Sequence, residues 1–314
     1  MKIYIEPGKS GNVITTIAIG DEYLSAWELY SLPSWEKYCK NNDLGLIIID
    51  SDLIDKSHKS WKKATWQKML LATVFRESVK TVRNVCYIDS DFLINHQAPN
   101  IFDFYDPETI GLVSQVKNLP YDELEVKRRI AFFRHHYYDS KYPLDSALFM
   151  TPEQIFKYHG LPEQDNYACA GLMVFNVDNH SELMKSWFDK YDRNIESITG
   201  GGDEFHFNHE VQTWGKIIWL DYRFQALWTY EMAWKYPFLY QLGKNKDESV
   251  AKCIEASLFT NFFLHFAGSW YESEMWKTEN VLTGDHLSPN FESFNEYRKV
   301  KLTGQPAGMI KPFK

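Results

Sequence analysis

Three short apolar runs alternate with segments of helical spacing in the N-terminal part of the chain, and this alternation constrains the fold more than any other feature. The runs, at residues 13–19, 46–49 and 85–88, are rich in isoleucine and valine. Such runs are typical of parallel strands buried on both faces of a sheet. Residues 23–40 and 61–80 between them carry apolar side chains at helical intervals. The pattern predicts a Rossmann-like α/β fold in which helices flank a mostly parallel central sheet.

The sheet continues beyond the third run. Apolar runs at residues 112–114, 170–177 and 217–220 predict further strands, and the periodicity of residues 182–194 predicts a helix. Because no linker divides this part of the chain, we expect it to form one large domain over residues 1–270.

Two segments fall outside the strand–helix pattern. Residues 121–142 are charged and aromatic, which predicts a helical insertion. Such a helix would serve as a lid or a platform for a ligand, or it would simply be an exposed amphipathic helix. Residues 271–314 are mostly polar, contain several prolines and glycines, and predict a C-terminal extension.

Charge and cysteine usage exclude some partners. With a formal net charge of −8, the chain lacks the dominant basic face that binds nucleic acid. Its four cysteines lie far apart, without the spacing of a zinc site, which indicates reduced thiols in a cytoplasmic protein. The first residues lack the apolar core of a signal peptide, and no stretch is long enough to span a bilayer. We expect a soluble protein that is at most peripheral to a membrane, and the sequence leaves its oligomeric state open.

Asp89, Ser90 and Asp91 directly follow the third apolar run. Ligands of α/β sheets bind at the carboxyl ends of strands. Two carboxylates one residue apart can turn there toward one cation, and Mg²⁺ or Mn²⁺ prefers such oxygen ligands while keeping positions for phosphate oxygens. The segment predicts a site for Mn²⁺ or Mg²⁺, and the alternative is a solvated turn.

Asp50, Ser51 and Asp52 repeat the same tripeptide after the second run. Doubly wound folds often place an acidic residue there, on the hydroxyl groups of a ribose. This segment is therefore a second candidate for ligand binding. The alternative is that both aspartates are ordinary turn residues.

The stretch Tyr87-Ile88-Asp89-Ser90-Asp91-Phe92-Leu93 resembles the metal-binding signature of GT-A glycosyltransferases. It is most similar to family 8, the glycogenin-like and lipopolysaccharide-galactosyltransferase-like enzymes. Further segments resemble motifs of that family, in the same order, over residues 12–270. They are the first strand with Asp21 and Tyr23 after it, Trp66-Gln67-Lys68, residues 167–176, Gly202-Asp203-Glu204 and Leu264-His265-Phe266-Ala267-Gly268.

This resemblance implies a complete site. The metal would be held by Asp89, Asp91 and His265, and Asp203 and Glu204 would be catalytic residues that address the sugar and the acceptor. The nucleotide-sugar donor, a UDP-sugar in this family, would contact Thr16, Ile19, Asp21, Tyr23, Lys68, Asp89, Ser90, Gly171 and Gly268. Some of these residues also have structural interpretations. His265 would be a satisfied structural histidine, Asp203 a helix cap, and Lys68 a solvated helix residue.

Three positions depart from the family pattern. Cys169 stands where the family has an asparagine beside the sugar, and Glu204 replaces a glutamine near the reacting carbon. A carboxylate at position 204 can stabilise positive charge on the sugar, or attack it, better than an amide can. After His265 the family continues to a lysine on the diphosphate, whereas this chain has Ser269-Trp270-Tyr271.

The resemblance implies an enzyme, a nucleotide-sugar-dependent glycosyltransferase. It would move a sugar from a UDP-sugar to a hydroxyl of a glycan, glycolipid or glycoprotein, with metal assistance and retention of the anomeric configuration. An inverting transferase of the same fold, with Asp203 as base, is one alternative. A non-catalytic glycan-binding protein is another, favoured by Cys169 and the missing lysine. A sugar-nucleotide pyrophosphorylase needs a glycine-rich segment after its first strand, whereas Gly8-Lys9-Ser10-Gly11 precedes that strand here.

Overall fold

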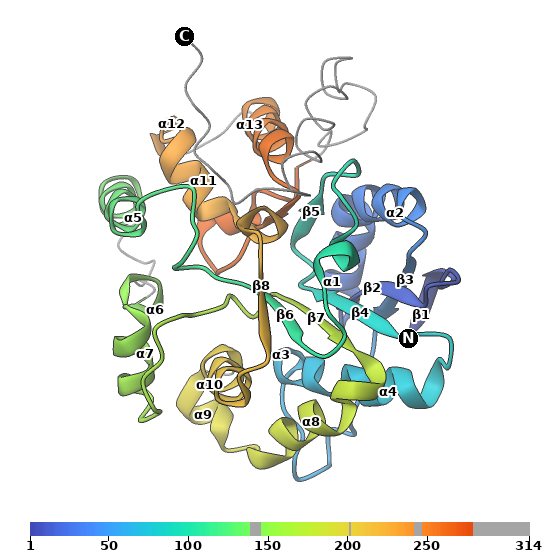
Figure 1. Ribbon diagram of the computed structural model, residues 1–314. Helices are drawn as coiled ribbons and strands as arrows, with labels where there is room; N and C mark the ends of the chain where they lie inside the picture. Colours follow the sequence, from blue (N-terminus) through green and yellow to red (C-terminus); the bar gives the residue numbers. More distant parts are fainter. Residues whose placement is uncertain (139–145, 201, 242–246, 279–314) are drawn as a thin grey trace.

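The apolar runs form the middle of a seven-stranded sheet in the computed structural model (Figure 1). The structure describes residues 1–138, 146–200, 202–241 and 247–278. The strands of this sheet follow the order β1-β3-β2-β4-β7-β6-β8. Their bounds are Lys2–Ile5 (β1), Asn12–Ile17 (β2), Gly45–Ile49 (β3), Asn84–Ile88 (β4), Ile110–Val113 (β6), Leu172–Asn176 (β7) and Ile217–Leu220 (β8).

Parallel and antiparallel pairs share this sheet. β2 pairs in parallel with β3 and with β4, and β6 pairs in parallel with β8. β7 runs antiparallel between β4 and β6, and β1 runs antiparallel to β3. The predicted α/β class, with helices flanking a central sheet, is confirmed, while parallel pairing within this sheet is confined to β3-β2-β4 and β6-β8. An apolar run buried on both faces does not reveal the direction of its strand, so the sequence could not show that β7 is reversed.

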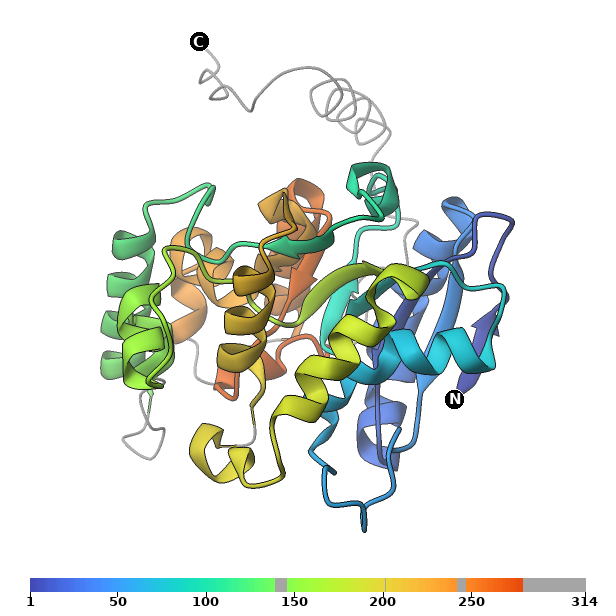
Figure 2. The same cartoon turned by 60° about the horizontal axis from the view of Figure 1, so that its bottom comes forward.

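Helices cover both faces of the sheet (Figures 1 and 2). One face packs against α4, α8 and α10, and the other packs against α2. Side chains of β4 point alternately to the two faces of the sheet. Val85 and Tyr87 pack in the core on the side of α4, α8 and α10, and Cys86 and Ile88 pack in the core on the side of α2. The helices of this part are α1 (Asp21–Ala26), α2 (Leu32–Asn41), α3 (Ala64–Gln67), α4 (Leu71–Ser78), α8 (Val177–Lys190), α9 (Ile195–Thr199) and α10 (Glu204–Trp214).

The two helical segments predicted before β4 each contain a change of helix type. A π-helix spans Trp27–Ser31 between α1 and α2, and a 3₁₀-helix spans Lys68–Leu70 between α3 and α4. Pro33 occupies the first turn of α2, where a backbone N–H has no helical partner, so the proline is compatible with the helix. The helix predicted at residues 182–194 is confirmed as α8, which starts earlier.

A second, three-stranded sheet lies beside the first. It contains β5 (Phe92–Ile94), β10 (Phe263–His265) and β9 (Ala226–Leu227), in that order. The remaining helices are α5 (Glu123–Tyr137), α6 (Ser146–Phe149), α7 (Pro152–Tyr158), α11 (Trp228–Lys235), α12 (Phe238–Gln241) and α13 (Asp247–Thr260), with 3₁₀-helices at Ile101–Phe104, Tyr222–Gln225 and Tyr271–Glu274.

α5 is the helix of the predicted insertion. It packs against α11 and α12, and its buried residues Val126 and Ile130 belong to a core separate from those of the large sheet. Met275 and Trp276, at the start of the predicted extension, pack into this same core. The rest of the insertion, residues 139–142, and most of the extension, residues 279–314, lie outside the described residues.

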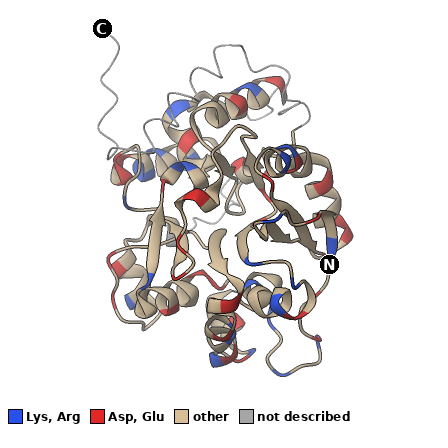
Figure 3. Ribbon diagram, turned by 45° about the vertical axis from the view of Figure 1, so that its right-hand side comes forward, with Lys and Arg blue, Asp and Glu red and all other residues tan. Residues whose placement is uncertain are grey.

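Charged residues and cysteines lie in different parts of the molecule. Lys, Arg, Asp and Glu residues gather on the outer helices and loops, while the central strands carry few of them (Figure 3). All four cysteines are buried and free. Across the described part of the chain, every helix is too short or too polar to traverse a bilayer.

Candidate metal centre and adjoining pocket

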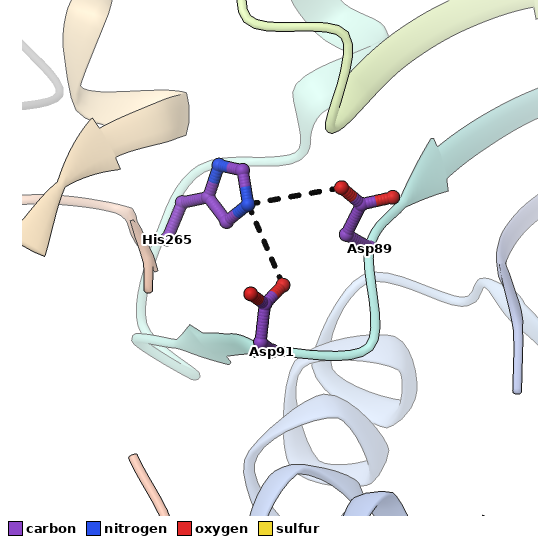
Figure 4. A group of neighbouring side chains, drawn as sticks. All are labelled: Asp89, Asp91 and His265. Atoms are coloured by element: carbon purple, nitrogen blue, oxygen red, sulfur yellow. Dashed lines mark ion pairs between the residues drawn. The ribbon is translucent and has the colours of Figure 1, made fainter. Parts of the chain in front are cut away.

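Asp89, Asp91 and His265 meet at the carboxyl end of β4 (Figure 4). Each residue offers one ligand atom, and these atoms lie within 4.8 Å of one another. Nε2 of His265 lies 3.4 Å from Oδ1 of Asp91 and 3.8 Å from Oδ2 of Asp89. The structure therefore brings together the three residues that the sequence suggested as metal ligands.

The pairing of β5 with β10 places His265 beside the aspartates. In the register of this antiparallel pair, His265 lies opposite Phe92, the residue after Asp91. The backbone N–H of Phe266 donates to the carbonyl oxygen of Asp91 over 3.1 Å. The rings of Phe92 and His265 stack with their centroids 4.2 Å apart. The position of His265 thus depends on the strand that follows the aspartates, which is far from His265 in the sequence.

Gly171 provides the space in which these side chains meet. The backbone N–H of Asp89 donates to the carbonyl oxygen of Gly171 over 2.9 Å, so the two segments are in contact. A Cβ atom at Gly171 would lie 2.4 Å from Cε1 of His265 and 2.8 Å from Oδ2 of Asp89. Any side chain there would displace a ligand atom, so glycine is needed for this close approach.

The donor set fits a divalent cation. Two carboxylates supply the oxygen ligands that Mn²⁺ or Mg²⁺ prefers, and imidazole is a common metal ligand. Oδ1 of Asp91 is buried and accepts no hydrogen bond from the described residues, which is unfavourable for a carboxylate oxygen that no cation binds. The Tyr87 hydroxyl donates to Oδ1 of Asp89 over 2.5 Å, which leaves Oδ2 of Asp89 facing His265.

The Nδ1 atom of His265 contacts Gln225 and Cys169, on the side of the ring away from the two aspartates. Nδ1 lies 3.2 Å from Nε2 of Gln225 and 3.6 Å from Sγ of Cys169, so Nε2 is the nitrogen that faces the carboxylates. Gln225 also donates to the carbonyl oxygen of Cys169 over 3.1 Å. Burial lowers the pKa of His265, but Cys169 and Asp91 outweigh this effect and hold the pKa well above its ordinary value, so a metal ion would bind Nε2 in exchange for a proton. His265 is therefore oriented by several partners.

Lys68 and Asp203 form a buried ion pair near the centre. Nζ of Lys68 lies 3.0 Å from Oδ2 of Asp203 and donates to the carbonyl oxygen of Ala170 over 2.6 Å. Burial favours the neutral amine, but the carboxylates of Asp203 and Asp89 outweigh it and raise the pKa of Lys68. Lys68 is thus not the solvated helix residue of the structural interpretation. Asp203 stands at the N-cap position of α10, yet its side chain makes no capping hydrogen bond.

Glu204 lies next to this pair, at the first position of α10. Burial raises its pKa, and Asp203 adds to this effect, whereas Lys68 and Tyr167 oppose it. The result is a pKa of about 7, compared with an ordinary value of 4.5. Its carboxyl group therefore changes between the neutral and the charged form near neutral pH.

The residues expected to contact the nucleotide lie at the end of β2, the strand that pairs with β4. Thr16 is fully buried within β2, and Ile19 follows the strand. Asp21 and Tyr23 are exposed in α1. Gly20 precedes this helix with a φ of 101°, a value that favours glycine. Asp21 and Tyr23 therefore follow a strand that ends beside the one leading to Asp89.

A pocket of about 170 Å³ adjoins the centre. It is lined by Cys169, which contacts His265, and by Glu204 and Gly268. Other lining residues come from α5, α7, α11 and adjoining segments. A single water needs about 10–15 Å³ of such space, so the pocket has room for a ring of monosaccharide size.

Two residues of the centre were not predicted as site residues. Tyr87 could have been found, because it lies two positions before Asp89 and side chains at that spacing share one side of an extended chain. Gln225 lies in a 3₁₀-helix far from either aspartate in the sequence, and no local pattern marks it. Ser90 was predicted to contact the nucleotide-sugar. The backbone carbonyl oxygen of Ser90 accepts a hydrogen bond from the Ser31 hydroxyl over 2.9 Å.

Comparison with known proteins finds only distant similarity, to solved structures. No protein-family model matches the chain, and no curated protein matches it. Among solved structures, a glycosyltransferase involved in glycosylation of the major capsid of PBCV-1 is similar at 12% identity and a TM-score of 0.43, over 84% of this chain and 98% of that chain. The bifunctional glycosyltransferase WbbM, in its apo structure, is similar at 12% identity and a TM-score of 0.45, over 86% of this chain and 47% of that chain. At these values the similarity carries no assignment of function.

Proposed function

We propose that the protein is a glycosyltransferase that moves a sugar from a nucleotide donor, a UDP-sugar, to a hydroxyl group of a glycan, glycolipid or glycoprotein. The observation that carries this proposal is the convergence of Asp89, Asp91 and His265 within 4.8 Å at the carboxyl end of β4. These are the same three residues for which the GT-A resemblance implies metal binding. Gly171 beside them has no side chain that would close the site.

The metal would be Mn²⁺ or Mg²⁺, held by Asp89, Asp91 and His265. When bound, it supplies positive charge that stabilises the departing nucleotide diphosphate. The surrounding residues keep the ligands in place, since Tyr87 orients Asp89 and Gln225 orients His265. Such orienting partners commonly contribute to metal affinity. Asp21 and Tyr23 lie on the same edge of the sheet and would contact the nucleotide.

Asp203 and Glu204 have different environments, which suggests different roles. Asp203 is 3% exposed and paired with Lys68, so it is poorly placed to accept a proton from an acceptor. We assign it a positioning role, because Lys68 also bonds the carbonyl oxygen of Ala170 next to Gly171. Glu204 lines the pocket. There its carboxylate would stabilise positive charge on the sugar in a retaining reaction, or accept the acceptor proton in an inverting one. The anomeric configuration of the product decides between them, and we expect retention.

Calorimetric binding of UDP tests the proposal, with GDP as the control nucleotide. We expect UDP to bind in the presence of Mn²⁺, to bind much more weakly without it, and to lose this metal dependence in Asp91→Ala. UDP binding that is indifferent to both the metal and the substitution would contradict the proposal. Metal-dependent binding would be followed by a screen of UDP-sugars for transfer.

A further inference from the structure

Two cationic side chains of α5, Lys127 and Arg134, line the pocket beside the metal centre. Both residues are almost fully buried, at 9% and 4% exposed. A buried cation is stable only when an anion compensates its charge, so the partners of Lys127 and Arg134 determine what the wall of the pocket presents to a ligand.

Each cation has a carboxylate partner that does not line the pocket. Nζ of Lys127 lies 2.6 Å from Oε1 of Glu123. Nε and Nη2 of Arg134 donate to Oε1 of Glu272 over 2.9 and 2.7 Å, and the Tyr138 hydroxyl donates to Oε2 of Glu272 over 2.6 Å. Because Glu123 and Glu272 are not among the lining residues, the pocket is lined by the positive member of each pair.

Arg134 also has an unused donor. Its Nη1 atom is buried and has no hydrogen-bond partner among the described residues. A buried donor without a partner is unfavourable, because it has lost its hydrogen bonds to water. The guanidinium lies against the ring of Trp270, with its carbon 4.0 Å from the ring centroid, which restrains its plane. Nη1 has almost no exposed surface, so a ligand oxygen reaches it only after a local rearrangement of the pocket wall. A planar carboxylate is the group that a guanidinium binds best.

The remaining lining residues suit a sugar ring. Tyr230 and Trp270 contribute aromatic side chains to the lining, which suit the C–H groups of a pyranose, and Gln115 and Thr229 contribute polar side chains, which suit its hydroxyls. Glu204 is the one carboxyl group among the residues that line this pocket. With a pKa of about 7, it is partly neutral at neutral pH and repels a second carboxylate less than an ordinary glutamate would.

We propose that this pocket binds an acidic sugar of the acceptor, a pyranose that carries a carboxylate, with the carboxylate on Lys127 and Arg134. This inference rests on the proposed glycosyltransferase function for its assignment to the acceptor. The binding preference itself is independent of catalysis. A neutral hexose lacks the carboxylate and leaves the donor of Arg134 unpaired, so it binds more weakly.

The test compares methyl glucuronide with methyl glucoside, which differ in a carboxylate against a hydroxymethyl group. Binding of each to the full chain is measured by ligand-observed NMR titration, with UDP and Mn²⁺ present. We expect the glucuronide to bind about tenfold more tightly, as a charge-assisted hydrogen bond would give. Lys127→Gln should remove most of this preference. Arg129→Gln is the matched control, because Arg129 is a cation of α5 that pairs with Glu125 and does not line the pocket.

Calorimetric UDP binding to the same variants separates the two proposals. Lys127→Gln should bind UDP like the unmodified chain, which also shows that it folds. Equal affinity for the two glycosides would overturn the acidic-sugar proposal, as would a preference that survives Lys127→Gln. A loss of UDP binding in a folded Lys127→Gln variant would overturn it too, because the cation would then serve the diphosphate. A preference for the glucuronide without metal-dependent UDP binding would support the acidic-sugar proposal and contradict the proposed glycosyltransferase function.

Discussion

The tripeptide Asp-Ser-Asp follows two strands of the same sheet, and its two copies have different surroundings. In the copy after β3, Asp50 forms an ion pair with the N-terminal amine of Met1. Oδ1 of Asp52 accepts hydrogen bonds from Nε1 of Trp61 over 3.1 Å and from Nε2 of Gln67 over 2.6 Å. These contacts lie within the protein and support a structural role.

In the copy after β4, Asp89 and Asp91 face His265 across Gly171, and Oδ1 of Asp91 has no hydrogen-bond donor among the described residues. The identical sequence therefore leads to one pair of aspartates held by protein donors and another pair in which Oδ2 of Asp89 and Oδ1 of Asp91 face His265. The difference comes from partners distant in the sequence, namely strand β10 and the glycine before β7. Substitutions in both copies can test this contrast.

Asp91→Ala should have the largest effect. Loss of an outer partner of a metal ligand commonly lowers metal affinity about 10–100-fold, so loss of the ligand itself should lower it by more than about 100-fold. Mn²⁺ binding is measured by calorimetry or electron paramagnetic resonance. Asp52→Ala, in the other copy, is the matched control and should bind Mn²⁺ within about twofold of the unmodified chain. Similar losses in both variants would contradict the contrast.

Gly171→Ala should have the next largest effect. The added Cβ would lie 2.4 Å from Cε1 of His265 and 2.8 Å from Oδ2 of Asp89, so at least one ligand must move. We expect a loss of about 10–100-fold in Mn²⁺ affinity, similar to the loss of an orienting partner. Gly202→Ala is the control, because a Cβ there meets no atom closer than 3.9 Å. Unchanged Mn²⁺ affinity in a folded Gly171→Ala variant would show that Gly171 does not shape the site.

Much of the fold was predictable because its strands are short apolar runs with clear ends. The grouping of the candidate metal ligands was predictable in part, since Asp89 and Asp91 lie in one local motif. Their convergence with His265 depends on the pairing of β5 with β10, and three-residue strands give almost no periodic signal. The sequence suggested His265 through a resemblance and not through its own pattern.

Burial and partners were the features that the sequence could not supply. The resemblance marked Lys68 as a donor contact, but its local pattern was that of a solvated helix lysine, and the structure makes it an internal cation beside Asp203. The two Asp-Ser-Asp copies were indistinguishable except for their neighbours in sequence. Gln225 and Trp270 enter the site from loops and short helices, where spacing carries little information.

The two regions should also differ in their response to pH. Hydrogen bonding to the N-terminal amine lowers the pKa of Asp50, so the first copy keeps its charge throughout the neutral range. Glu204, close to the second copy, has a pKa of about 7 among Asp203, Lys68 and Tyr167. If its ionised form is the active one, kcat/KM for sugar transfer is low below pH 7 and rises through it, about tenfold between pH 6 and pH 8. In Glu204→Gln this rise should disappear, and a rise that persists would assign it to another group.

The smallest effect on binding, and a measurable one on stability, is expected for Asp52→Ala. This substitution leaves Trp61 without the acceptor of its indole N–H and removes one of the two acceptors of the Gln67 amide. Loss of such partly buried hydrogen bonds should lower the free energy of unfolding by about 1–2 kcal/mol, measured by urea denaturation. Asp50→Ala should cost less, about 0–1 kcal/mol, because its ion pair is partly exposed to solvent. Stability loss without loss of Mn²⁺ affinity would establish the first copy as structural, whereas Mn²⁺ affinity that falls with Asp52 would mean that both copies contribute to one site.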